Sequence, residues 1–235
     1  MENVHAERSA GWSVLCYVGV LVLATFLNYG MPSVDVRPAT AALLIDAHRY
    51  GLLLGAWLTF PAAAFFLWFL VGLRGYLSYA PGRQEGLPTF ALVAGVVMVT
   101  LSLFAAAIET AALYAGPDAF AHYGLVGIYD TFIFTQGGLG YGPVAIFIFA
   151  AAHSMRRHDS APAWLARLGY VAAFGAAIAT LSIFFITTDS FMAPGQLGPG
   201  IFGAIPAAIW LVCTGVVLIQ SKRGSSEVSS TSGAS

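Results

Sequence analysis

Charged side chains are scarce in this sequence. Its 235 residues include ten Lys and Arg and eleven Asp and Glu, so that 9% are charged and 58% are hydrophobic. A soluble domain carries roughly 25% charged residues, and the mean hydropathy of +0.79 is far from that class. The apolar runs also reach the ~20 residues that cross a bilayer. The composition predicts a multi-pass membrane protein, and the lack of a basic patch argues against nucleic acid as a partner.

Other absences narrow the chemistry. The two cysteines, Cys16 and Cys213, fall in apolar runs, which is typical of small core residues and not of a disulfide or metal pair. The sequence has no CxxCH for haem and no HxxxH, HExxH or DxxD spacing for a metal ion. It has no lysine within an apolar run to hold retinal, and no Asp-rich diphosphate motif. We therefore predict neither a cofactor nor a metal site.

Six apolar runs predict six membrane-spanning helices, near 11–29, 49–74, 88–109, 132–155, 166–188 and 200–220. They are expected to be helical because backbone groups in lipid must be satisfied within the segment, and the alternating pattern of a β-barrel is absent. The predicted fold is an all-α bundle, one domain over residues 1–223 followed by a disordered Ser-rich tail, 224–235. The first run lacks a clear cleavage pattern, which favours a retained helix over a removed signal.

Basic residues predict the orientation of this bundle. In a six-span arrangement eight of them fall on one side and two on the other. The larger group is Arg8, Arg74, Arg83, Arg156, Arg157, Arg167, Lys222 and Arg223, and the smaller is Arg37 and Arg49. Because positive residues concentrate in cytoplasmic segments, we predict a cell-membrane protein with both termini in the cytoplasm.

Short similarities indicate repeated helical hairpins. The second and fourth runs begin with "YGLLLGAW" at Tyr50 and "YGLVGIYD" at Tyr123, and they continue with "PAAAFFL" at Pro61 and "PVAIFIF" at Pro143. The third and fifth runs share "TLSLF" and "TLSIF". Repeats of this kind are common in membrane transporters, although they do not by themselves establish transport.

The stretch "YDTFIFTQGGLGYGP", from Tyr129 to Pro143, does not look like a simple span. The two tyrosines above are 73 residues apart and the two prolines 82, so the fourth run carries nine extra residues in this stretch. A bilayer core that ends near Arg156 would begin roughly seven residues before Pro143. We therefore predict an extracytoplasmic insertion at about 115–142 that covers the helix ends. The alternative is a helix that continues from Tyr123.

Most of the remaining acids gather on the predicted outer side. We predict three catalytic carboxyl groups there: Glu109, Asp130 and Asp189. The predicted substrate-binding residues are Asp46, His48, Arg49, His122, Tyr129, Gln136 and Trp57. Each has a structural alternative, because acids and histidines at helix ends also cap helices, form local ion pairs or lie at the membrane interface.

A pair of carboxyl groups in a half-dry pocket can divide the roles of general acid and carboxylate partner. Aromatic residues form 14% of the chain, and their ring faces could stabilise a cationic intermediate. The predicted function is a small membrane enzyme with acid–base chemistry on an apolar isoprenoid- or lipid-like substrate, such as a proton-initiated cyclisation. The alternatives are a proton-coupled transporter or permease and a non-catalytic membrane subunit or sensor. The oligomeric state is left open.

The second half carries a family resemblance. The segments "AIETAALYAG", "PAWLARLGYVAAFGAA" and "PAAIWLV" resemble an uncharacterised family of bacterial six-helix membrane proteins, defined by a domain of unknown function. The resemblance covers roughly residues 100–220. It implies the six-helix architecture and marks Glu109 as the acid that is similar to the family's, and it implies no activity.

Overall fold

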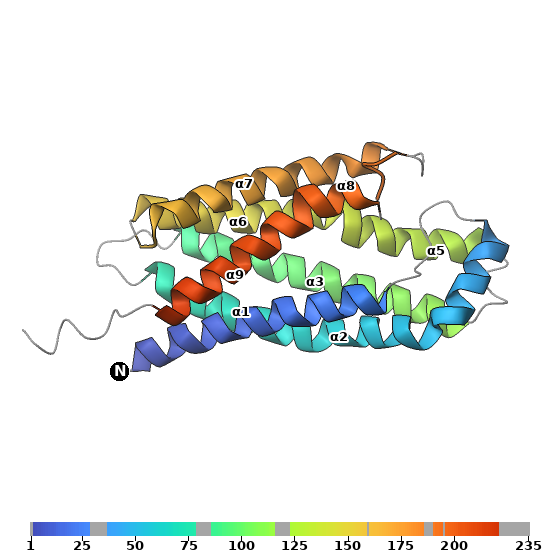
Figure 1. Cartoon of the computed structure of the whole chain (residues 1–235), viewed down its shortest axis with the longest axis horizontal. Helices are drawn as coiled ribbons and strands as arrows, with labels where there is room; N and C mark the ends of the chain where they lie inside the picture. Colours follow the sequence, from blue (N-terminus) through green and yellow to red (C-terminus); the bar gives the residue numbers. More distant parts are fainter. Residues whose placement is uncertain are drawn as a thin grey trace, which may run out of the picture.

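The computed structural model describes residues 2–28, 37–78, 86–115, 123–158, 160–185, 190–194 and 196–220. Within these ranges every regular element is helical, and six helices are long and apolar enough to cross a membrane (Figure 1). The α-helices are α1 (Glu2–Leu27), α2 (Pro38–Ser78), α3 (Gly86–Ala115), α5 (Tyr123–Phe134), α6 (Tyr141–Arg157), α7 (Ala163–Thr180), α8 (Leu197–Pro199) and α9 (Ile205–Gln220). Six apolar helices are thus confirmed, and they suggest a multi-pass membrane protein.

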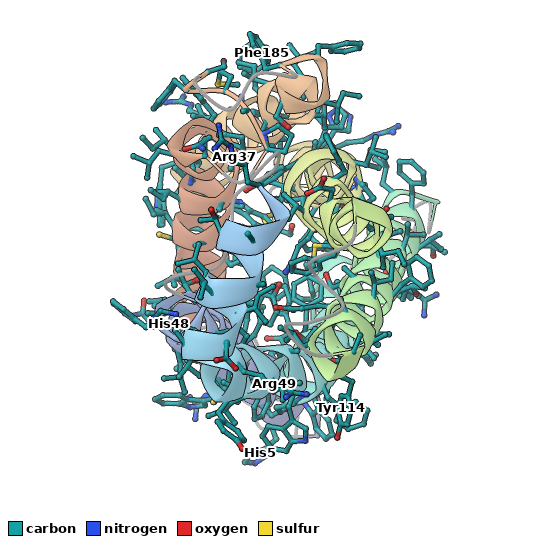
Figure 2. The ribbon with its side chains drawn as sticks, turned by 90° about the vertical axis from the view of Figure 1, so that its right-hand side faces the viewer. His5, Arg37, His48, Arg49, Tyr114 and Phe185 are labelled. Carbon is teal, nitrogen blue, oxygen red and sulfur yellow. The ribbon has the colours of Figure 1, made fainter. Side chains whose placement is uncertain are left out.

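Two of the predicted spans are longer than expected. Helix α3 continues to Ala115, so Glu109 lies inside the helix and not at its end. Helix α2 begins at Pro38 and has 41 residues, about 60 Å at 1.5 Å per residue, which is twice the thickness of a bilayer core. Its first turns bend across one end of the bundle (Figures 1 and 2). The covering of that end is therefore formed by the start of α2.

The Tyr129–Pro143 stretch is helical. Helices α5 and α6 are joined by a π-helical segment, η1 (Thr135–Leu139), with only Gly140 between η1 and α6. Residues 123–142 are therefore helical, as in the alternative of a helix that continues from Tyr123. That this stretch is an extracytoplasmic insertion stays a prediction. The nine extra residues extend the helix, and residues 116–122 lie outside the description.

A proline follows each of the two widened segments, although Pro61 lies within the regular helix α2. A proline ring clashes with the carbonyl four residues earlier and donates no N–H, which disturbs a regular α-helix. For Pro143 that carbonyl belongs to Leu139, in η1, and for Pro206 it belongs to Phe202, in a second π-helical segment, η3 (Gly200–Ala204). Widening by one residue per turn is a known way to accommodate such a disturbance.

The hydrophobic core is divided into two clusters. The larger includes the aromatic side chains of Phe66, Phe69, Phe147 and Trp210, which meet at tilted or edge-to-face angles and are each at most 1% exposed. It reaches the end of the bundle where α1 begins and α9 ends. The smaller joins the start of α2 to α3 and α5 and is centred on Ile45, Leu52, Ala105, Leu113 and Phe132. Between the two clusters α3 contributes residues 100–104 and the α5–α6 helix contributes residues 134–146.

Helices α1 and α9 pack closely through glycine. A Cβ atom added to Gly11 would lie 2.7 Å from the carbonyl oxygen of Gly215, which leaves no room for a side chain. Small residues allow this approach in membrane bundles. The tight crossing brings α9 against α1, and both helices contribute to the walls of the site described below.

Candidate functional site

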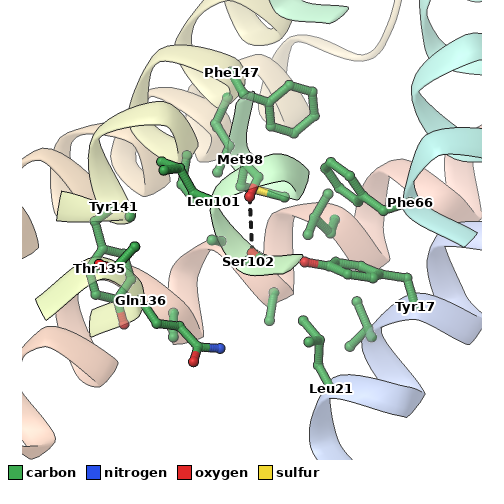
Figure 3. A pocket seen from close by; sticks show the side chains of 18 residues that line it. Tyr17, Leu21, Phe66, Met98, Leu101, Ser102, Thr135, Gln136, Tyr141 and Phe147 are labelled. Carbon is green, nitrogen blue, oxygen red and sulfur yellow. Dashed lines mark hydrogen bonds between the residues drawn. The ribbon is translucent and has the colours of Figure 1, made fainter. Parts of the chain in front are cut away.

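A cavity of about 200 Å³ lies in the gap between the two core clusters, and we name it the inner cavity. Its walls come from α1, α2, α3, η1, α6, η3 and α9, and most of the lining atoms are apolar (Figure 3). The hydroxyl of Tyr17 and the amide of Gln136 point into it from opposite walls. Its lining residues include Tyr17, Phe66, Met98, Leu101, Ser102, Thr135, Gln136, Tyr141, Phe147 and Leu211.

A second, wider cavity of about 550 Å³ adjoins the first, and we name it the outer cavity. The two share five lining residues, Val18, Leu21, Gln136, Ala204 and Ala208, so they lie side by side, and we refer to them together as the joined cavities. The outer cavity adds polar side chains to an apolar wall: Thr25, Asn28, Thr59, Glu109 and Gln196. An apolar space with a few placed polar groups is the usual form of a small-molecule site.

Both π-helical segments lie in the wall of this space. Thr135 and Gln136 come from η1, and Gly200, Ile201 and Ala204 come from η3. Such segments are frequent at functional sites because the extra residue in the turn changes where side chains point. The glycine-rich stretch at Thr135–Leu139, which falls in the predicted insertion, therefore helps to shape the cavity, and so does the one at Gly200–Ala204.

Glu109 is the one charged residue among the residues that line either cavity. Its side chain is 2% exposed, and its Oε1 has no hydrogen-bond partner among the described residues. An ionisable group inside a membrane span is costly unless it is paired, and it is usually retained for function. Glu109 is therefore the strongest candidate for chemistry in this space.

Asn28 supplies a second unsatisfied polar group in the outer cavity. Its Oδ1 is buried and has no hydrogen-bond partner among the described residues. The side chain lies directly against Gly55 of α2, at a place where a Cβ atom would overlap the amide oxygen. Since buried polar atoms nearly always have partners, Asn28 and Glu109 together indicate a place for a ligand that carries a polar group.

The structure places two of the predicted site residues in the wall of one cavity. Glu109 and Gln136 both line the outer cavity, whereas Asp130 is half-buried on α5 and lines neither cavity. Asp189 and His122 lie outside the described residues. Tyr129 belongs to α5, but its side chain is also outside the description. Glu109 and Asp130 therefore do not line a common cavity, and a place for Asp189 beside either of them stays a prediction.

The remaining predicted residues lie near the surface. Asp46 and His48 are exposed on α2, and a ring nitrogen of His48 lies 3.1 Å from the carbonyl oxygen of Leu44 (Figure 2). Arg49 donates a hydrogen bond from Nη2 to the carbonyl oxygen of Tyr114, 3.4 Å away. This bond satisfies a carbonyl at the end of α3, which is a structural role. Trp57 is 63% exposed on the outside of the bundle.

Sequence reasoning missed several lining residues. Asn28 had a signal, since it is one of two asparagines and sits at the end of an apolar run. Gln196 also had a signal, because it is a polar residue beside a stretch rich in Gly and Pro, as Gln136 is. Tyr17, Ser102 and Thr59 had none, because single hydroxyl groups inside apolar runs are common.

Within the parts of the chain that the structure describes, no group of three His, Cys, Asp or Glu side chains lies together. Glu109 thus supplies the one carboxyl group among the described residues that line the joined cavities, and the other polar side chains there carry amide or hydroxyl groups.

Comparison with known proteins adds no assignment. No family model matches the chain, and neither the curated proteins nor the solved structures contain a significant match. The resemblance of residues 100–220 to a six-helix family thus stays a prediction.

Replacing Glu109 should show how much its buried carboxyl group lowers the free energy of unfolding. We expect Glu109→Met to raise the free energy of unfolding by about 1–2 kcal/mol, because the variant removes an unpaired buried polar group and keeps a similar length. Chemical unfolding in detergent micelles measures this change.

Thr214→Val is the matched control for that variant. Thr214 is also buried, but its hydroxyl donates a 2.8 Å hydrogen bond to the carbonyl oxygen of Trp210. Its replacement should leave stability unchanged or lower it by up to about 1 kcal/mol. A Glu109→Met variant that is less stable than the wild type would mean that Glu109 holds the fold together.

Proposed function

We propose that this chain is a small membrane enzyme that binds an apolar, isoprenoid- or lipid-like molecule in the joined cavities. Glu109 acts on that molecule as a general acid and then as a base. The observation that carries the proposal is a single buried carboxyl group, without a partner among the described residues, in the wall of a largely apolar space inside a membrane bundle. The amide groups of Asn28 and Gln136 would orient a polar end of the substrate.

One carboxyl group is enough for an isomerisation. Glu109 donates its proton to a carbon–carbon double bond or an epoxide oxygen, which leaves a carbocation and a carboxylate. A second double bond of the same molecule can attack the cation and close a ring by forming a carbon–carbon bond. Loss of a proton from a neighbouring carbon to the carboxylate restores both the double bond and the acid. Substrate and product are isomers, so no co-reactant is needed.

Aromatic rings at the inner end support a cationic intermediate. Tyr17, Phe66 and Phe147 line the inner cavity, and the rings of Tyr17 and Phe66 have centroids 4.7 Å apart. The negative face of an aromatic ring attracts a cation, most strongly where water is excluded. A substrate that reaches from Glu109 into the inner cavity would place its developing charge among these rings.

The packing beyond the inner cavity favours an enzyme over a transporter. Phe66 and Phe147 have ring centroids 5.5 Å apart, and Phe147 and Trp210 5.8 Å, so that edge-to-face contacts fill the bundle there. A transporter needs a path that continues to the opposite side, whereas a binding site can end at such a cluster. The proton-coupled transporter is therefore the weaker candidate.

The positions of basic residues favour one orientation of the bundle in the membrane. The start of α1 and the end of α9 lie at one end of the bundle, near the α6–α7 turn (Figure 1). Arg156 and Arg157 are in the last turn of α6, at the same end. By the positive-inside rule this end faces the cytoplasm, and the covered end with the outer cavity faces away from it.

A reporter fused after residue 235 tests this orientation. A green fluorescent protein should fluoresce there, and an alkaline phosphatase at the same place should be inactive, because the phosphatase needs an oxidising compartment to fold. The opposite pair of results would reverse the orientation.

The catalytic proposal is tested by untargeted metabolite profiling of cells that express the wild type, Glu109→Gln or Asp130→Asn at matched membrane levels. We expect a product that the wild type makes and that Glu109→Gln reduces by a factor of about 100 or more, the contribution typical of a general acid. Asp130→Asn should retain most of the product, because Asp130 lines neither cavity.

Two results would contradict this proposal. If wild-type and Glu109→Gln cells have the same metabolites, with both proteins folded in the membrane, Glu109 has no catalytic role. If Asp130→Asn abolishes the product and Glu109→Gln does not, the acid has been assigned to the wrong residue.

A further inference from the structure

A separate apolar groove lies on the outside of the bundle, between α3, α6 and α7. It has a volume of about 520 Å³ and is lined by Phe90, Ala145, Ile146, Phe149, Tyr170, Ala173, Phe174 and Ala177. None of these residues lines the inner or outer cavity. Phe149 and Phe174 are 51% and 69% exposed, so the groove opens toward the surrounding membrane.

One end of this groove is polar. The Nδ1 atom of His153 lies 3.1 Å from the hydroxyl of Tyr170, within hydrogen-bonding distance. The ring of Phe149 stacks on the His153 ring, with centroids 5.8 Å apart and an interplanar angle of 12°. His153 and Tyr170 therefore join α6 and α7 at the end of the groove that is nearer to the α6–α7 turn.

Two arginines follow on the same side. Arg157 comes one helical turn after His153 on α6, and Arg167 comes three residues before Tyr170 on α7, so helical periodicity places both on the groove side. Both are exposed. Because α6 and α7 run antiparallel and pack side by side (Figure 1), these two residues lie at the same level of the hairpin.

The charge of this hairpin end is positive. Helices α6 and α7 contain no Asp or Glu, and they carry three arginines, Arg156, Arg157 and Arg167. The turn between the helices contains one acid, Asp159, which lies outside the described residues. Basic groups between membrane helices on the cytoplasmic side are suited to bind the headgroup of an anionic lipid.

We propose that this groove binds one anionic phospholipid. An acyl chain lies along Phe149 and Phe174, and the phosphate group lies between Arg157 and Arg167. Arg157 is eight residues beyond Phe149, about 12 Å along the helix axis, so the headgroup lies at the end of the span and the chain within it. His153 and Tyr170 lie between the two parts, where hydrogen bonds can reach the ester groups. This inference is independent of the proposed function.

Native mass spectrometry of the purified full chain tests the proposal. Detergent-solubilised protein is titrated with phosphatidylglycerol and, separately, with phosphatidylcholine of the same acyl chains. We expect one phosphatidylglycerol to bind more tightly than phosphatidylcholine, and Arg157→Gln/Arg167→Gln to weaken its binding roughly 10- to 30-fold. The matched control is Arg8→Gln/Arg37→Gln, which removes two exposed arginines elsewhere and changes the net charge equally. It should keep the preference.

A second variant tests the apolar part. Ala177→Trp fills the groove and should remove the bound lipid, whereas Val171→Trp, at an exposed position of α7 outside the groove lining, should not. Equal binding of the two lipids to the wild type would overturn the proposal. So would an unchanged preference in Arg157→Gln/Arg167→Gln or retained binding in Ala177→Trp, with helix content and monodispersity matched to the wild type.

Discussion

The arrangement of this bundle depends on an interruption of its hydrophobic core. Large aromatic side chains pack in one cluster and mainly aliphatic side chains in the other, while the segments between the clusters contribute residues of mixed size, from glycine to leucine and tyrosine. These residues do not fill the middle of the bundle, and two adjoining cavities remain there. Under the proposed function, that space accepts an apolar molecule from the surrounding lipid and holds it next to a few polar groups.

Local chemistry explains where the interruption falls. Pro143 and Pro206 each follow a π-helical segment, and both segments border the space. The widened turns lie where the regular pattern of core-facing side chains is shifted, so Gln136 reaches the cavity from a helix that is otherwise apolar. Glu109 faces the same space from α3, two turns before that helix ends. The π-helical segments and the unpaired carboxyl group thus border the same space.

Composition and apolar run length were sufficient to predict six membrane helices, because crossing a bilayer requires both. They could not predict that α2 starts at Pro38 or that residues 123–142 are helical, since glycine and proline that usually end helices can also widen them. Glu109 and Gln136 were predictable as rare polar residues in apolar surroundings. Asn28 is also a rare polar residue at the end of an apolar run, but Tyr17 gave no signal. The place of both in the site depends on how α1 packs against α2 and α9, which is a property of the assembled bundle.

The central claim is that the joined cavities hold an apolar molecule, and photo-crosslinking with an aliphatic diazirine tests it most directly. After irradiation of the protein in membranes, peptide mass spectrometry should find the label on cavity-lining residues of α1, η1 and η3, such as Leu21 and Gln136. Ala208→Trp, which fills the wall that the two cavities share, should abolish that label, and Ala107→Trp on the exposed side of α3 should not. Label found solely on outward-facing residues such as Trp57 and Trp68, and unchanged by Ala208→Trp, would contradict the account.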